Sequence, residues 1–127
     1  MPHVLIVDDD AFIRDLIADI LELEGYSVRA AVDGLAGVRE YTALRPDCVV
    51  LDVMMPGIDG FEVLRQMRCV DDLPVPVIML TAAGEPESQR EAWVGGADFF
   101  LQKPFEPEQL VEVMESLLSD SPLRPAL

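Results

Sequence analysis

Basic residues are scarce in this chain of 127 residues. It carries nine Lys and Arg, only one of them Lys, against 24 Asp and Glu, so its formal net charge is −15. A protein this acidic repels phosphate backbones and anionic membrane surfaces, and its few bases are scattered singly along the chain. The composition therefore argues against direct binding to nucleic acid or to a lipid surface.

Long apolar runs and metal-type cysteine spacings are absent as well. The first apolar stretch, Val4 to Val7, is too short for a signal peptide or a membrane span. The two cysteines, Cys48 and Cys69, have no metal-type spacing, and we interpret them as reduced thiols of the core. Reduced thiols persist in a reducing compartment, so we expect a cytoplasmic protein.

Half of the residues are apolar, and the length suits one domain with its own core. Short β-type runs alternate with segments of helical period. The predicted strands are residues 4–7, 28–32, 48–53, 75–80 and 99–101. The predicted helices are residues 12–24, 34–44, a segment after Asp59, 87–95 and a segment from Pro107. On the first helix, one apolar face is predicted to hold Phe12, Ile13, Leu16, Ile17, Ile20 and Leu21.

This alternation predicts an α/β fold. Right-handed crossovers give a doubly wound five-stranded parallel sheet of order 2-1-3-4-5, the (βα)5 flavodoxin-like three-layer sandwich. Its first and third strands are neighbours at the topological switch point, where ligands bind beyond the carboxyl ends. The domain is predicted to span residues 1–118. Residues 119–127, with two prolines and no periodicity, resemble a tail or the start of a linker.

Polar residues follow the strands that meet at this switch point. In chain order they are Asp8, Asp9, Asp10, Asp52, Thr81 and Lys103. Clustered carboxylates repel one another, so this edge of the sheet favours a bound cation. Two or three carboxylates with a backbone carbonyl and waters suit Mg²⁺ better than Zn²⁺, because no His or Cys is near in the pattern.

Each of these residues also has an ordinary structural explanation. Asp10 alone is better interpreted as a helix N-cap, Thr81 alone as a β-branched strand residue and Lys103 alone as a surface residue. Convergence of Asp8, Asp9 and Asp52 at one switch point is harder to explain as coincidence. Lys103 gains meaning from its position, because an ammonium after the fifth strand can reach an anion at the same edge.

Four motifs carry these residues: VDDD at 7–10, LDVMMPGIDG at 51–60, LTA at 80–82, and GAD at 96–98 followed by KPF at 103–105. Together they resemble the receiver domain of two-component response regulators, over residues 3 to about 118. The resemblance implies a signalling domain rather than an enzyme. Such a domain accepts a phosphoryl group from a histidine kinase or phosphotransfer protein and controls an output.

The resemblance also implies the roles of individual residues. Asp52 would be the phosphoacceptor, and Asp9, Asp52 and the backbone carbonyl of Met54 would bind Mg²⁺ directly. Asp8 would bind the ion through water. The chemistry is reasonable, because an anionic carboxylate can attack an anionic phosphoryl group only if Mg²⁺ and Lys103 offset the charge.

Two residues would form the switch. Thr81 and Lys103 would contact the phosphoryl group, and the movement of Thr81 would vacate space that Phe100 can fill. Phe100 taken alone is also explained as a core residue of the fifth strand.

The downstream effector would bind the face of the fourth helix, fifth strand and fifth helix, which leaves a phosphorylation-dependent homodimer open. The last helix carries Glu108, Glu112 and Glu115 without Arg, unlike the pairing face of one large subfamily of DNA-binding regulators.

Other functions compete with this interpretation. A haloacid-dehalogenase-type phosphatase would use Asp8 and Asp10, but Phe12 does not suit its motif, the chain leaves no room for a cap, and Asp52 would have no role. A nucleotide or flavin module should have a Gly-rich or hydroxyl-rich loop where the three aspartates stand. A pseudo-receiver that works without phosphorylation is disfavoured because all the site residues are present.

Overall fold

The computed structural model describes residues 2–70, 74–81 and 96–119. These residues form five strands: β1 (His3–Val7), β2 (Ser27–Ala31), β3 (Cys48–Asp52), β4 (Val77–Thr81) and β5 (Phe99–Gln102). All pairings are parallel and the order is β2-β1-β3-β4-β5. The predicted α/β class and strand order are therefore confirmed.

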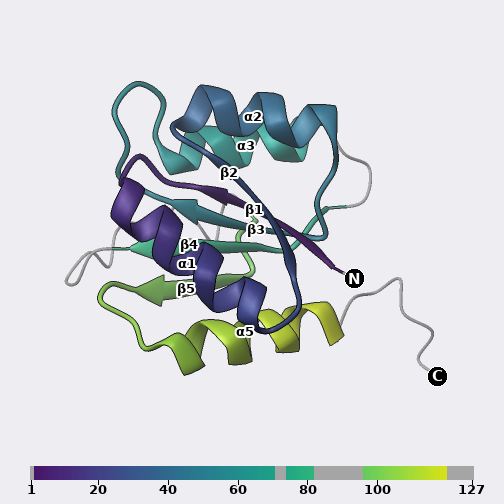
Figure 1. Ribbon diagram of the computed structural model, residues 1–127. Helices are drawn as coiled ribbons and strands as arrows, with labels where there is room; N and C mark the ends of the chain where they lie inside the picture. Colours follow the sequence, from purple (N-terminus) through teal and green to yellow (C-terminus); the bar gives the residue numbers. More distant parts are fainter. Residues whose placement is uncertain (1, 71–73, 82–95, 120–127) are drawn as a thin grey trace.

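Helices cover both faces of the sheet. In the described residues, α1 (Ala11–Leu23) and α5 (Pro107–Ser119) lie on one face, and α2 (Gly34–Ala43) and α3 (Gly60–Val70) lie on the other (Figure 1). This arrangement is the predicted three-layer sandwich. The helix predicted at 87–95 lies outside the described residues, and so do residues 120–127 of the predicted tail.

The sheet separates two apolar cores. Alternate residues of β3 face opposite sides: Val49 and Leu51 pack in the core under α2 and α3, and Cys48 and Val50 pack in the core under α1 and α5. Because both faces are covered, the central strands are apolar at nearly every position rather than at every second one. All residues of β3 and β4 are buried, including the polar residues Asp52 and Thr81 at their carboxyl ends.

Three residues that were predicted on an apolar helix face or in the core lie on the surface instead. On α1, Ile17 and Leu21 are fully buried, but Phe12 is 72% exposed and Leu16 is 37% exposed. The predicted apolar face was wider than the stripe that a helix presses against a sheet, and Phe12 and Leu16, four residues apart, lie at its outer margin. Cys69, near the end of α3, is also exposed, and both cysteines are free.

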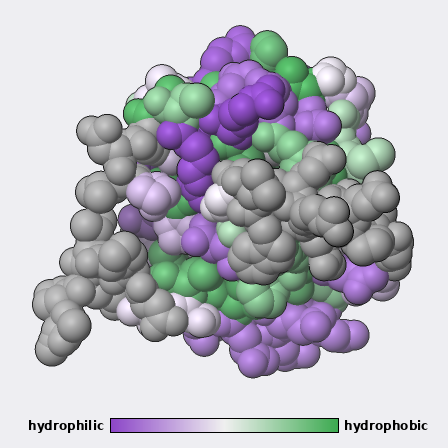
Figure 2. Space-filling view, turned by 180° about the vertical axis from the view of Figure 1, so that it is seen from behind, coloured by the Kyte–Doolittle hydropathy of each residue, from purple (hydrophilic) through white to green (hydrophobic). Residues whose placement is uncertain are grey.

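The reverse side of the molecule shows a hydrophobic area bordered below by hydrophilic residues, at the level of α5 (Figure 2). This border agrees with the amphipathic pattern of α5, which buries Leu110 and Met114 and exposes Glu112 and Glu115. None of the helices in the described residues combines the length and apolar character that crossing a membrane requires.

Candidate functional site

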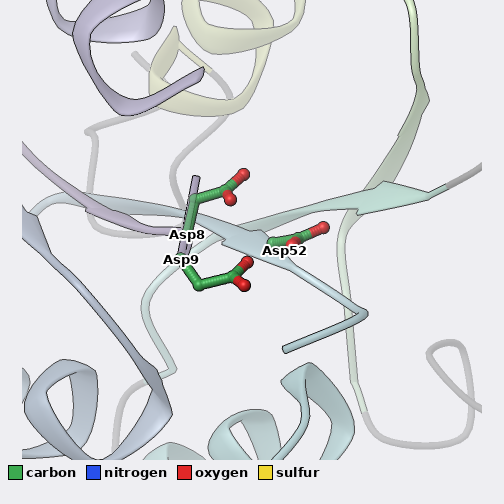
Figure 3. Close-up of side chains that lie close together, drawn as sticks. All are labelled: Asp8, Asp9 and Asp52. Atoms are coloured by element: carbon green, nitrogen blue, oxygen red, sulfur yellow. The ribbon is translucent and has the colours of Figure 1, made fainter. Parts of the chain in front are cut away.

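The register of the sheet brings the predicted acidic residues together. Val7 at the end of β1 pairs with Leu51 of β3, so the residues that follow them, Asp8 and Asp52, reach the same level of neighbouring strands. Carboxylate oxygens of Asp8, Asp9 and Asp52 lie within 4.8 Å of one another. The three carboxylates point to the same side of the strand ends (Figure 3).

Asp8 is fully buried and its polar atoms are held by neighbours. Its main-chain N–H donates to the carbonyl of Ala31 at 3.3 Å, its Oδ1 accepts the N–H of Asp10 at 2.9 Å, and its Oδ2 lies 3.4 Å from Nζ of Lys103. Asp9, by contrast, is exposed. The pair therefore combines one fixed carboxylate with one that faces solvent at the mouth of the cluster.

Asp10 has the structural role that the sequence favoured. It is the N-cap of α1, and its Oδ1 accepts the main-chain N–H groups of Phe12 at 2.9 Å and Ile13 at 3.5 Å. These bonds satisfy donors that a helix terminus leaves unpaired. The carboxylate of Asp10 thus caps α1, and Asp10 is not a member of the acidic cluster.

Lys103 brings the one ammonium of the chain to the cluster. Its main-chain N–H donates to the carbonyl of Thr81 at 2.8 Å, which continues the pairing of β5 with β4. Its Nζ donates to Oδ1 of Asp52 at 3.1 Å and to Oδ2 of Asp8 at 3.4 Å. Burial lowers the pKa of Lys103, but its hydrogen bonds and charge attraction to Asp52 and Asp8 outweigh burial and raise the pKa overall. The side chain therefore remains a cation.

One ammonium does not balance the carboxylates around it. Burial, followed by repulsion from Asp8, raises the pKa of Asp52 from 3.8 to about 6, even though the hydrogen bond and charge of Lys103 act in the opposite direction. Asp9 adds a smaller repulsion. The cluster therefore holds more negative charge than its surroundings stabilise, and a cation among the three acids would relieve it.

Thr81 and Phe100 lie on the same face of the sheet. Thr81 follows Val77 and Met79 at two-residue intervals along β4, and Phe100 pairs with Met79 and packs against the core that contains both. Thr81 is buried, and within the described residues its hydroxyl has no hydrogen-bond partner. A buried unpaired hydroxyl is costly, so its presence at the strand end calls for an explanation.

Gly60 is a site residue for which the sequence motifs predicted no separate role. A Cβ at this position would lie 2.3 Å from the carbonyl oxygen of Asp52 and 2.9 Å from the Cα of Val53. Its N–H donates to the carbonyl of Val53 at 2.9 Å, so α3 begins directly against the end of β3. Only glycine permits this approach. Met54 lies in the intervening loop and is 64% exposed.

The fold and site together define a class of protein: a doubly wound α/β domain with a partly buried acidic cluster and a lysine at its switch point. The chain belongs to the response regulator receiver domain family, whose model matches residues 4–115. The family predicted from the motifs is thereby confirmed, together with its phosphoacceptor signalling role.

Curated relatives are longer than this chain. The DNA-binding dual master transcriptional regulator RpaA of a Synechocystis strain is 41% identical over 119 residues, which are 93% of this chain and 49% of that protein. Response regulator MprA of Mycobacterium avium is 42% identical over 116 residues, 91% of this chain and 50% of that protein. The chain thus spans about half the length of the curated relatives it matches.

Solved structures show the same fold. NtrX of Brucella abortus, determined in complex with ADP, matches with a TM-score of 0.89 and 34% identity over 94% of this chain and 27% of that one. Chemotaxis protein CheY4 of Vibrio cholerae matches with a TM-score of 0.83 and 34% identity over 93% of this chain and 99% of that one. These matches support none of the alternative functions.

Proposed function

We propose that this domain accepts a phosphoryl group on Asp52 from a histidine kinase or phosphotransfer protein, with Mg²⁺ as its cofactor. One observation carries the proposal: three carboxylates converge within 4.8 Å at the switch point, with Nζ of Lys103 3.1 Å from Asp52. The arrangement supports a site for a cation and an anion together, which is what phosphoryl transfer to a carboxylate requires.

The residues fit a hard divalent cation. Asp52 and the exposed Asp9 would bind Mg²⁺ directly, together with the backbone carbonyl of Met54. Both carboxylate oxygens of Asp8 already accept hydrogen bonds, which favours contact through water instead. When bound, the ion offsets the charge of the phosphoryl oxygens.

Asp52 and Lys103 would perform the transfer. A carboxylate oxygen of Asp52 forms the new bond to phosphorus while the bond from phosphorus to the donor nitrogen breaks and its electron pair leaves with the donor. The charged ammonium of Lys103 stabilises the phosphoryl oxygens throughout. In this sense the domain catalyses its own phosphorylation and dephosphorylation, although it is a signalling domain rather than an enzyme with an external substrate.

The switch would begin at Thr81. Its hydroxyl, which has no hydrogen-bond partner among the described residues, can donate to a phosphoryl oxygen, and Phe100, on the same face of the sheet, would move into the space left behind. The output would be a downstream effector domain or protein at the face of β5 and α5, together with the predicted fourth helix outside the described residues. The same face would serve a phosphorylation-dependent homodimer. We propose residues 1–118 as the receiver domain, a cytoplasmic location, and no direct contact with nucleic acid or membrane.

Phosphorylation by a small-molecule donor tests the assignment of Asp52. The protein is incubated with acetyl phosphate and MgCl₂, and intact mass and peptide mapping locate the added phosphoryl group. We expect modification of Asp52 that chelation of Mg²⁺ prevents. Asp52→Asn should not be modified, and Asp10→Asn, a control that keeps a capping side chain outside the cluster, should be modified like the wild type.

Two results would reject the proposal. A label on Asp8, or steady hydrolysis of phosphomonoesters, would indicate the phosphatase instead. A wild-type protein that stays unmodified with both MgCl₂ and donor would indicate a receiver that works without phosphorylation.

A further inference from the structure

Arg14 is a charged residue on the side of α1 that faces the sheet. It stands three residues before Ile17 and seven before Leu21, and both of these are fully buried, so the three share one side of the helix. Its side chain is half-buried, and Nη1 donates to the main-chain carbonyl of Asp8 at 2.8 Å. An arginine at a core-facing position needs a partner, and here the partner is the backbone of the acidic cluster.

The bond from Arg14 completes the fixation of Asp8. The main-chain N–H of Asp8 is bound to Ala31, and its carboxylate is bound to the N–H of Asp10 and to Lys103. The carbonyl is the remaining polar group, and Arg14 holds it. Since this peptide group joins Asp8 to Asp9, the bond sets the plane from which the carboxylate of Asp9 projects.

We propose that Arg14 is a positioning residue of the acidic cluster. Its guanidinium fixes the peptide between Asp8 and Asp9, and thereby the direction in which their carboxylates meet a cation. The inference rests on the proposed function, because the cation that the acidic cluster would bind is Mg²⁺. Arg14 itself does not contact the ion or the phosphoryl group in this scheme.

Simple electrostatics predicts the opposite effect of Arg14 on cation binding. A positive charge near the cluster repels Mg²⁺, so its removal should strengthen Mg²⁺ binding if charge alone matters. If position matters more, removal should weaken binding, because outer partners of metal sites typically contribute 10- to 100-fold in affinity. The direction of the change therefore separates the two roles.

The experiment measures Mg²⁺ affinity by titration calorimetry of the metal-free protein, with MgCl₂ as the titrant. We expect Arg14→Gln to weaken Mg²⁺ binding by about tenfold. Arg14→Lys keeps the charge but not the planar fork of donors, and should lose affinity in the same direction. The control is Arg39→Gln, which removes the same charge from the exposed surface of α2 and should bind like the wild type.

A second measurement needs no metal. The N–H of Asp10 donates to Oδ1 of Asp8, so a loosened Asp8 should expose this amide to faster hydrogen exchange. We expect faster exchange of the Asp10 amide in Arg14→Gln and Arg14→Lys than in Arg39→Gln. Should Arg14→Gln fail to fold, Arg14→Lys supplies both measurements.

Each outcome bears on one of the two proposals. Equal or tighter Mg²⁺ binding by folded Arg14 variants would overturn the positioning role. If the wild type itself binds no Mg²⁺, the proposed function fails. The exchange rate of Asp10 then decides about Arg14: unchanged exchange would overturn its role and faster exchange would support it.

Discussion

The two ends of the parallel sheet differ in how well their charged side chains are balanced by partners. At the carboxyl end, three carboxylates lie together, the ammonium of Lys103 bonds two of them, Asp8 and Asp52, and the pKa of Asp52 rises to about 6. At the amino end, Arg68 donates to the carbonyls of Val75 at 2.8 Å and Gly96 at 2.6 Å and pairs with Asp98 at 3.3 Å. Charge is in excess at one end and matched at the other.

A second arginine at the amino end is matched in the same way. Arg29 of β2 donates to Nε2 of His3 at 2.7 Å, to Oε1 of Glu40 at 2.5 Å and to the carbonyl of Leu44. Burial, then the charge of Arg29, lowers the pKa of His3, so its neutral imidazole can accept this bond. Asp47 in turn accepts the main-chain N–H of His3 at 2.7 Å.

The difference separates charges that hold the fold from charges that serve a ligand. The arginines at the amino end join strands to helices and loops, and their partners are all supplied by the chain. At the carboxyl end, the single ammonium of Lys103 does not balance the three carboxylates of the cluster. Charged groups left unbalanced inside a fold are a common mark of a functional site. Substitutions at the two ends should therefore change stability in opposite directions.

The largest effect is expected at Arg68. Arg68→Ala would leave the carbonyls of Val75 and Gly96 without their donor and Asp98 without its cation, at a cost of about 3 kcal/mol in the free energy of unfolding. Urea denaturation measures the loss. The control is Arg65→Ala on the same helix, whose side chain is 71% exposed and pairs with Glu62 at the surface. It should cost less than about 0.5 kcal/mol. Equal losses would contradict a structural role for the charges of the amino end.

At Asp52 we expect a substitution to increase the free energy of unfolding rather than decrease it. The raised pKa of this buried acid corresponds to roughly 3 kcal/mol of destabilisation when it is ionised. Asp52→Asn loses the charged bond to Lys103 but removes that penalty, so we expect the metal-free protein to gain about 2 kcal/mol at pH 7. The matched control is Asp98→Asn, which weakens the pairing with Arg68 at the other end and should destabilise. A loss of stability in Asp52→Asn would remove the contrast between the two ends.

The gain from Asp52→Asn should depend on pH. Asp52 titrates near 3.8 when unfolded and near 6 when folded, so within this window the folded protein binds the extra proton. The contribution of Asp52 to the free energy of unfolding is greatest below about pH 4. It decreases as the pH rises to about 6, by at most about 1.4 kcal/mol per pH unit. Urea denaturation of wild type and Asp52→Asn across this range isolates the effect of Asp52 and the acids coupled to it, because the titrations of groups that do not interact with Asp52 cancel in the difference. A difference that stays constant from pH 4 to 7 would show that the pKa of Asp52 is not raised.

Most of the fold was predictable because the apolar pattern is strong where both faces of the sheet are covered. Cys48 to Leu51 form an uninterrupted buried run, and the predicted bounds of β3 are wrong by one residue. The start of β4 was predicted two residues early, at Val75. Pro76 has no N–H to donate, so regular pairing begins only at Val77.

The acidic cluster was predictable for a topological reason, since parallel strands carry their carboxyl ends to one edge. The contacts of Arg14 and Gly60 were not, because they depend on how closely α1 and α3 approach the strand ends. The sequence nevertheless contains a signal for each of these two residues. Arg14 occupies a core-facing position three and seven residues before Ile17 and Leu21, and Gly60 directly follows the N-cap Asp59.

The smallest effect is expected at Thr81, where the carboxyl end leaves a neutral group unsatisfied. Its buried hydroxyl has no partner within the described residues, so Thr81→Val replaces a desolvated polar atom by a methyl group of similar size. We expect a gain of about 1 kcal/mol in urea denaturation. Thr42→Val is the control, because the hydroxyl of this exposed residue on α2 donates to the carbonyl of Val38 at 2.9 Å and its loss should bring no gain. If Thr81→Val destabilises the protein instead, the hydroxyl is already satisfied before phosphorylation, and the unbalanced region is confined to the charges around Asp52.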